Sequence, residues 1–298
     1  MNTLINKFQV FLKEERKSDL TIKNYTSHMN HFLKWFEDSK GISFSRLKRE
    51  NFLEYLSFLR NVEKVSRGKN KGLPLNVRTI NSKISSLIRF NEFLINEGVE
   101  KEWLITKEDL IKIQSSYFSL SKIIAKDVER FRQLILEGFN SKRNFTIVTI
   151  MAYGGLRISE VLNLKIHDVS IVGGDIIVRK GKREKYRTVF MNDRVATALK
   201  GWFKERKEKG IDNEYLFVSK RNNKLDKTVI NRMFNEYSIK LEIEITPHDL
   251  RHFFCTYLLE KGFAIHEVKN MAGHENINTT MIYANPSVTQ MKEKMKNL

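Results

Sequence analysis

Apolar residues recur every three or four positions through the first hundred residues, a spacing that indicates amphipathic helices. Four stripes of this kind predict four helices. The stripes are Leu4, Ile5, Phe8, Phe11 and Leu12; Ile22, Tyr25, Met29, Phe32, Leu33 and Phe36; Phe52, Leu53, Tyr55, Leu56, Phe58 and Leu59; and Ile80, Ile84, Leu87, Ile88, Phe93 and Leu94. Thr21 is the expected N-cap of the second helix, and Gly98 is expected to close the fourth. The pattern predicts a compact helical module.

The periodicity is lost after residue 98, and we place a linker at 101–122. Helices are expected again near 126–137, 142–153, 193–208, 227–241 and 247–261. Before the third of these, GGDIIVR and YRTVFM flank a basic turn and predict a β-hairpin. The expected fold is therefore mainly α with a small antiparallel β-sheet. It comprises a helical domain at 1–100, an α+β domain at 123–285 and a tail at 286–298.

The charge of the chain favours a polyanionic partner. The 298 residues include 53 Lys or Arg against 35 Asp or Glu, a net charge of +18. Nucleic acid is the commonest partner of such proteins, although solvated lysines are the simpler alternative.

No apolar run could cross a bilayer and the N-terminus does not resemble a signal peptide, so we expect the cytoplasm and no membrane partner. The single Cys255 excludes an internal disulfide and a cysteine-rich zinc site.

Two basic motifs stand in contexts that propensity does not explain. Arg157 follows a pair of glycines that permits a tight turn, although it could simply pair with Glu160. The run RKGKREKYR at 179–187 holds six basic residues and one acidic residue. It is either a solvated hairpin tip or a finger that enters a DNA groove.

Two further motifs lie towards the C-terminus. His248 and Arg251 are three residues apart at the start of a predicted helix, where free N–H groups favour an anion. The alternative has Asp249 capping that helix while the histidines make ordinary hydrogen bonds. His274 follows a glycine, and Tyr283 lies nine residues later in a predicted short helix. A tyrosine in such a place could equally serve packing.

Together these stretches resemble the catalytic domain of the tyrosine recombinase (phage integrase) family, whose motif order is Arg, Lys, His-x-x-Arg, His and Tyr. The matching stretches are GGLRISE with Arg157, the hairpin with Lys182, HDLRH with His248 and Arg251, GH with His274, and Tyr283. Lys180 and Lys185 share the hairpin, but Lys182 follows Gly181 and precedes Arg187 by five residues, as in the family. The resemblance covers about residues 121–290. Phe190 stands where the family commonly has proline.

The resemblance implies an enzyme that cleaves and rejoins DNA through a 3′-phosphotyrosine, without metal, cofactor or ATP. Tyr283 would be the nucleophile, with Arg157, Arg251 and His274 stabilising the phosphate. Lys182 would protonate the leaving 5′ oxygen, and His248 would move the proton of the tyrosine. The first hundred residues also resemble the helical core-binding (SAM-like) domain of the family.

The partners implied are a double-stranded DNA recombination site and further copies of the chain, as a cyclic tetramer on two sites. Val288, Met291 and Met295 give the tail helical spacing, and a tail helix would dock on the neighbouring subunit. The sequence leaves open whether an accessory protein takes part and whether the outcome is integration, excision or resolution. Two alternatives remain: a DNA-binding protein without catalysis on the same fold, and a topoisomerase-like enzyme that nicks and closes DNA.

Overall fold

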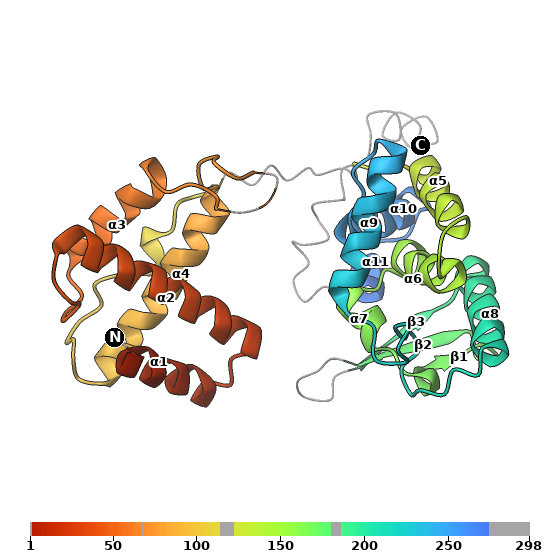
Figure 1. Cartoon of the computed structure of the whole chain (residues 1–298), viewed down its shortest axis with the longest axis horizontal. Helices are drawn as coiled ribbons and strands as arrows, with labels where there is room; N and C mark the ends of the chain where they lie inside the picture. The colour runs from red at the N-terminus through yellow and green to blue at the C-terminus, as the bar shows by residue number, and fades with distance from the viewer. Residues whose placement is uncertain (1, 67, 69, 114–121, 180–185, 274–298) are drawn as a thin grey trace, which may run out of the picture. The chain divides into compact units, whose positions relative to one another are not determined.

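The chain divides into two compact units, Met1–Ser115 and Ser116–Leu298. The computed structural model describes residues 2–66, 68, 70–113, 122–179 and 186–273 (Figure 1). No helix within these ranges is both long and apolar enough to cross a lipid bilayer.

The first unit is helical, as the apolar spacing predicts. Its elements are α1 (Asn2–Glu14), α2 (Asp19–Lys40), α3 (Arg49–Asn61), α4 (Val77–Asn96) and the 3-10 helix η1 (Lys107–Asp109). Aromatic rings fill its core. Phe32 meets Tyr55 edge-on at a centroid distance of 5.0 Å, and Phe8 meets Phe90 at 5.3 Å. Such edge-to-face pairs add to the stabilisation that burial of the rings provides.

The N-cap of α2 differs from the prediction. Ser18, rather than Thr21, caps the helix, because its hydroxyl accepts the backbone N–H of Thr21 at 3.2 Å. Both residue types are good N-caps, so the pattern alone did not distinguish them. The helix therefore begins at Asp19, three residues earlier than a Thr21 cap allows.

Part of the segment assigned to a linker packs against the first unit. Ile105 is fully buried in the helical core. The amide side chain of Asn81 on α4 also holds the backbone of Ile111, donating to its carbonyl and accepting its N–H, both at 2.9 Å. The described linker residues up to this point therefore belong structurally to the helical unit.

The second unit surrounds one buried helix. Its elements are α5 (Ala125–Leu136), α6 (Ser141–Gly154), α7 (Ile158–Asn163), η2 (Ile166–Asp168), β1 (Val169–Ser170), β2 (Asp175–Arg179), β3 (Tyr186–Phe190), α8 (Asp193–Glu208), α9 (Lys227–Leu241), α10 (Pro247–Glu260) and α11 (Ile265–Ala272). Helix α6 packs against α5, α8 and α10 (Figure 1), and its residues from Thr146 to Gly154 are all buried. A helix of this kind forms the centre of a domain rather than its surface.

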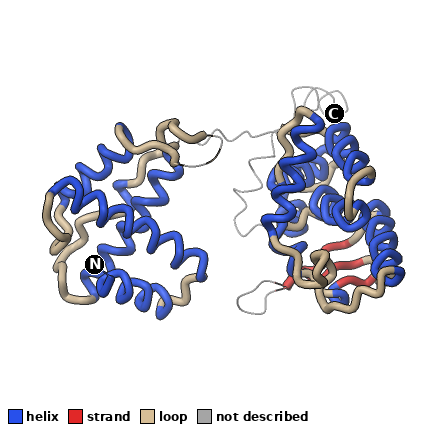
Figure 2. Tube along the Cα trace, viewed as in Figure 1, coloured by secondary structure: helices blue, strands red, loops and turns tan. Residues whose placement is uncertain are grey.

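The predicted hairpin is present as β2 and β3 of a three-stranded antiparallel sheet ordered β1-β2-β3. The strands lie together beside the helices of this unit (Figure 2). Val178 pairs with Arg187, and Arg187 and Val189 alternate with the exposed residues of β3. Because side chains alternate across a strand, Arg187 shares the inward face with buried Val189. The hairpin tip, residues 180–185 with Lys182, lies outside the described residues.

Candidate active site

The turn between α6 and α7 presents Arg157. Gly155 ends α6 with φ +67°, and a Cβ there would lie 2.3 Å from the ring of Phe254. The position therefore requires glycine, as the sequence pattern indicated. Arg157 follows with extended backbone at the N-cap of α7, and 41% of its side chain is exposed. The turn thus leaves this guanidinium accessible to solvent.

Helix α10 supplies Arg251 from its second turn. Thr246 caps the helix and forms a capping box with Asp249, and Pro247 occupies the first turn. The alternative role considered for Asp249 is therefore present. Arg251 is buried and donates to the carbonyl oxygens of Gly155 and Ala272. It joins α10 to the turn that carries Arg157.

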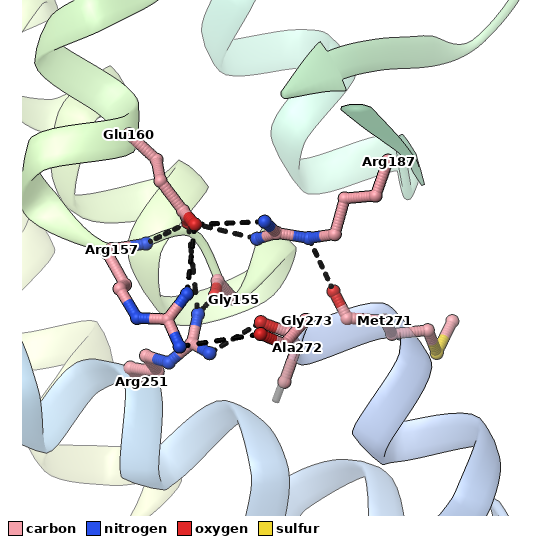
Figure 3. Close-up of polar contacts among 8 residues, drawn as sticks. All are labelled: Gly155, Arg157, Glu160, Arg187, Arg251, Met271, Ala272 and Gly273. Atoms are coloured by element: carbon pink, nitrogen blue, oxygen red, sulfur yellow. Dashed lines mark hydrogen bonds and ion pairs between the residues drawn. The ribbon is translucent and has the colours of Figure 1, made fainter. Parts of the chain in front are cut away.

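Within the part of the chain that the structure describes, the carboxylate of Glu160 lies among these arginines (Figure 3). Glu160 accepts the backbone N–H of Arg157 at 2.7 Å and its guanidinium at 3.0 Å. Both of its oxygens also accept from Arg187 at 2.9 Å, and Arg251 lies 3.9 Å away. The pair between Arg157 and Glu160 considered as an alternative exists, but it forms one part of a larger cluster.

Opposing effects set the protonation of this cluster. Burial alone would raise the pKa of Glu160, but the hydrogen bonds and charge of Arg187, with those of Arg157, lower it to about 2. Burial and the neighbouring charge of Arg157 lower the pKa of Arg251 to about 10. At neutral pH the carboxylate is therefore ionised and Arg251 remains charged.

The C-terminal end of α11 completes the site. The carbonyl oxygens of Met271, Ala272 and Gly273 accept hydrogen bonds from Arg187, Arg251 and Arg157, in that order. The last carbonyls of a helix lack intrahelical donors and carry the negative end of its dipole, so they attract cations. Gly273, with φ +67°, directly precedes His274 in the chain.

The structure brings together Arg157 and Arg251 of the predicted site residues. His248 is exposed in the first turn of α10, and its ring centroid lies 4.2 Å from that of His252. Lys182, His274 and Tyr283 lie outside the described residues. Burial raises the pKa of the Cys255 thiol to about 11, which makes it a poor nucleophile at neutral pH.

Two site residues were not assigned from the sequence, namely Glu160 and Arg187. Glu160 belongs to the motif GGLRISE, but a glutamate three residues after an arginine is typical of any helix surface. Arg187 ends a basic run, which made it look like one more surface charge. Its alternation with the apolar Val189 was the available signal of an inward position.

The cluster is suited to binding a phosphate. Guanidinium groups match the geometry of phosphate oxygens and stay charged when buried. Three arginines around one carboxylate leave a positive excess at the exposed Arg157. Within the described residues, no three His, Cys, Asp or Glu side chains gather as metal ligands would.

Comparison with known proteins identifies the family. Residues 122–290 match the phage integrase family, and residues 5–98 match the phage integrase N-terminal SAM-like domain. The chain is 46% identical over 293 residues to TnP I resolvase of Bacillus thuringiensis, covering 98% of both chains. It is 31% identical to tyrosine recombinase XerA of Thermococcus kodakarensis, over 98% of this chain and 94% of the relative.

The fold agrees with these matches. The Tn1549 transposon integrase in complex with a circular intermediate DNA aligns with a TM-score of 0.73, at 20% identity over 99% of this chain and 98% of the other. The chain therefore belongs to the phage integrase family of tyrosine recombinases. Its class is that of site-specific DNA recombinases, enzymes that cleave and rejoin DNA strands, and DNA is its partner.

Proposed function

We propose that Tyr283 cleaves DNA by attacking a backbone phosphate. The phenol oxygen forms a bond to phosphorus, the bond to the 5′ oxygen breaks, and a 3′-phosphotyrosine remains. The tyrosine proton passes towards His248, and Lys182 protonates the leaving 5′ oxygen. Attack by the 5′ hydroxyl of another strand reverses these steps and rejoins the DNA. Because the phosphodiester energy is kept in the covalent bond, the exchange requires no ATP.

One observation carries this proposal: Arg157 and Arg251, from separate helices, converge at the carbonyl groups directly before His274. Negative charge builds on the non-bridging oxygens as the phosphate is attacked. Two fixed guanidiniums and the His274 imidazole would stabilise that charge electrostatically. Metal ions perform the same task in many nucleases, so this site supports cleavage without a metal.

We assign the two units the roles that the corresponding domains have in the family. We infer that residues 1–100 form the core-binding domain and residues 123–285 the catalytic domain, both on double-stranded DNA in the cytoplasm. The biological outcome we propose is recombination for a mobile element. The 46% identical relative is named a resolvase, which favours resolution over integration.

Assembly as a cyclic tetramer is part of the proposal. A cavity of about 430 Å³ opens between the end of β3, α10 and α11, and its lining includes Phe190, Tyr257, Leu258, Phe263 and Met271. Phe190 and Phe263 expose 71% and 38% of their surface there. We propose that residues 286–298 of a neighbouring subunit fill this cavity with Val288, Met291 and Met295. Such head-to-tail contacts close a ring.

Deletion of residues 286–298 tests the assembly. It is expected to impair the pairing of two DNA sites more than the binding of one, because the core-binding and catalytic units keep their DNA contacts. Gel shifts at increasing protein concentration separate the two complexes. Equal loss of both complexes would contradict the assigned role of the tail.

The chemistry is tested by incubating the protein in EDTA with DNA from its own genetic neighbourhood, beside Tyr283→Phe. A denaturing gel is expected to show a covalent protein–DNA adduct in the wild type and none in the variant. Complexes without an adduct would favour a DNA-binding protein without catalysis. Relaxation of a plasmid that lacks any recombination site would instead favour a topoisomerase-like activity.

A further inference from the structure

Arg187 connects three parts of the active site that are far apart in the sequence. It lies on β3, donates through both terminal nitrogens to Glu160 of α7, and donates through Nε to the carbonyl of Met271 on α11 at 3.3 Å (Figure 3). These partners are 27 and 84 residues away. One guanidinium therefore fixes the distance between the start of α7 and the end of α11.

The surroundings of Arg187 indicate support rather than DNA contact. Only 14% of its side chain is exposed, against 41% for Arg157, and its partner Glu160 exposes 12%. All three nitrogens of the guanidinium already donate to protein oxygens. Arg157 also donates to Glu160 and Gly273, but its greater exposure leaves it accessible to a ligand, whereas Arg187 is enclosed by the protein.

Steric contact with the turn before His274 restricts Arg187 further. A Cβ at Gly273 would lie 2.8 Å from both Cζ and Nε of Arg187. The guanidinium therefore packs directly on the backbone of Gly273, whose carbonyl accepts from Arg157 at 3.4 Å. A displacement of Arg187 would be transmitted to the position of that carbonyl.

We propose that Arg187 is a positioning residue for DNA cleavage, acting through Glu160 and the C-terminal end of α11. Glu160 also accepts from Arg157 at 3.0 Å, and by donating to both of its oxygens Arg187 reduces how much of this carboxylate's charge acts on Arg157 and Arg251. More of the positive charge of those two arginines is therefore left for the phosphate. The inference rests on the proposed function, since it concerns the same phosphate site.

Loss of Arg187 has a defined consequence. In Arg187→Gln, Glu160 loses the partner that binds both of its oxygens, keeps Arg157 and Arg251 as its nearby cations among the described residues, and moves towards them. The cleavage rate is expected to fall about ten- to a hundred-fold, the usual range for groups that orient a functional residue. DNA affinity is expected to change less than about three-fold, because the exposed contacts remain. Arg187→Lys keeps the charge but cannot donate to both oxygens of Glu160 in the same geometry. Its cleavage rate should therefore lie between those of the wild type and Arg187→Gln.

The experiment measures single-turnover cleavage of a nicked DNA site together with the dissociation constant. Arg132→Gln is the control, because Arg132 lies in the same unit, exposes only 8% of its side chain, and donates to both oxygens of Glu129. It reports the general cost of breaking a buried arginine–carboxylate pair. The expected result is slow cleavage with normal binding in Arg187→Gln, and near-normal cleavage in Arg132→Gln below its melting temperature.

If Arg187→Gln lowers the stability of the protein, a double-mutant cycle with Glu160→Gln still tests whether Arg187 acts through Glu160. When Arg187 acts through Glu160, adding Arg187→Gln to Glu160→Gln costs far less than Arg187→Gln costs alone. Fully additive losses, or a binding defect as large as the cleavage defect, would overturn the inference. Normal cleavage by Arg187→Gln would overturn it while leaving the proposed function intact. Absence of any Tyr283-dependent adduct in the wild type would overturn both.

Discussion

The two units of this protein bury basic side chains in opposite ways. In the first unit, His28 bonds to Ser86 and His31 to Tyr55, each at 2.7 Å, beside the buried Lys83. Burial and the charge of Lys83 lower the pKa of His28 to about 4, and burial lowers the pKa of Lys83. The imidazole of His28 is therefore neutral at neutral pH, so burial removes its charge.

In the second unit burial also lowers the pKa of a histidine, His252, to about 4, but the most deeply buried basic side chains described there are arginines, whose charge persists. Arg251 keeps its proton at neutral pH despite burial, and one ionised carboxylate, Glu160, partly balances the cluster. Guanidinium is the one basic side chain that does not neutralise in a protein interior. The comparison indicates that side-chain chemistry decides whether charge survives burial. A buried guanidinium keeps its proton at the candidate phosphate site and also at Arg206, which donates only to backbone carbonyls, whereas a buried imidazole loses its proton.

The largest effect is expected when the guanidinium of Arg251 is replaced by the ammonium group of lysine. Arg251→Lys is expected to lower the cleavage rate by about 10²–10³-fold, because one ammonium cannot reach Gly155, Ala272 and a phosphate together. Single-turnover cleavage measures the loss. The matched control is Arg206→Lys, since Arg206 is also buried and donates to backbone carbonyls in the same unit. Equal losses in the two variants would show that Arg251 serves only the fold.

A smaller effect concerns the balancing carboxylate. The pKa of Glu160 in the folded protein is about 2, below its ordinary 4.5, so its stabilisation is complete above pH 4.5 and is lost as pH falls towards 2. Over that window the unfolding free energy of the wild type should fall by up to about 3 kcal/mol more than that of Glu160→Gln. Urea denaturation at a series of pH values measures the difference. Parallel curves would mean that Glu160 is not held by the arginines.

The smallest effect belongs to the first unit. The lowered pKa of His28 means that the unfolded chain binds its proton first, so stability falls as pH drops from about 6.5 to about 4. Lys83 and His31 face His28, and Glu63 and Tyr55 face His31. His28→Gln should reduce the acid sensitivity of α2 and α4. Hydrogen exchange of these helices, corrected for intrinsic rates, tests this, and an unchanged pH response in His28→Gln would contradict it.

Local pattern was enough to predict most of the architecture. Apolar spacing predicted the four helices of the first unit and α5, α6, α8, α9 and α10 of the second, because each stripe reflects burial of one face. The hairpin followed from two β-rich runs around a basic turn. The N-cap of α2 was assigned to Thr21 instead of Ser18 because both residue types are good caps. The packing of Ile105 was missed because it depends on a tertiary contact that apolar spacing does not specify.

The site was predictable only in part. Arg157 and Arg251 belong to short motifs whose order along the chain is informative. The roles of Glu160 and Arg187 depend on contacts between elements 27 residues or more apart, which no local pattern specifies. The apolar pattern also did not predict helix α11, although the carbonyl groups at its C-terminal end accept hydrogen bonds from three arginines. Proximity in the fold, rather than residue type, distinguishes these groups from ordinary surface charges.

The most direct test of the account is to identify the residue that becomes linked to DNA. Wild-type protein is incubated with its DNA site in EDTA, the adduct is digested with protease, and the DNA-linked peptide is sequenced by mass spectrometry. The account predicts a phosphodiester on Tyr283 that forms without metal. Linkage to another residue, or an adduct that forms only when a divalent cation is added, would contradict it.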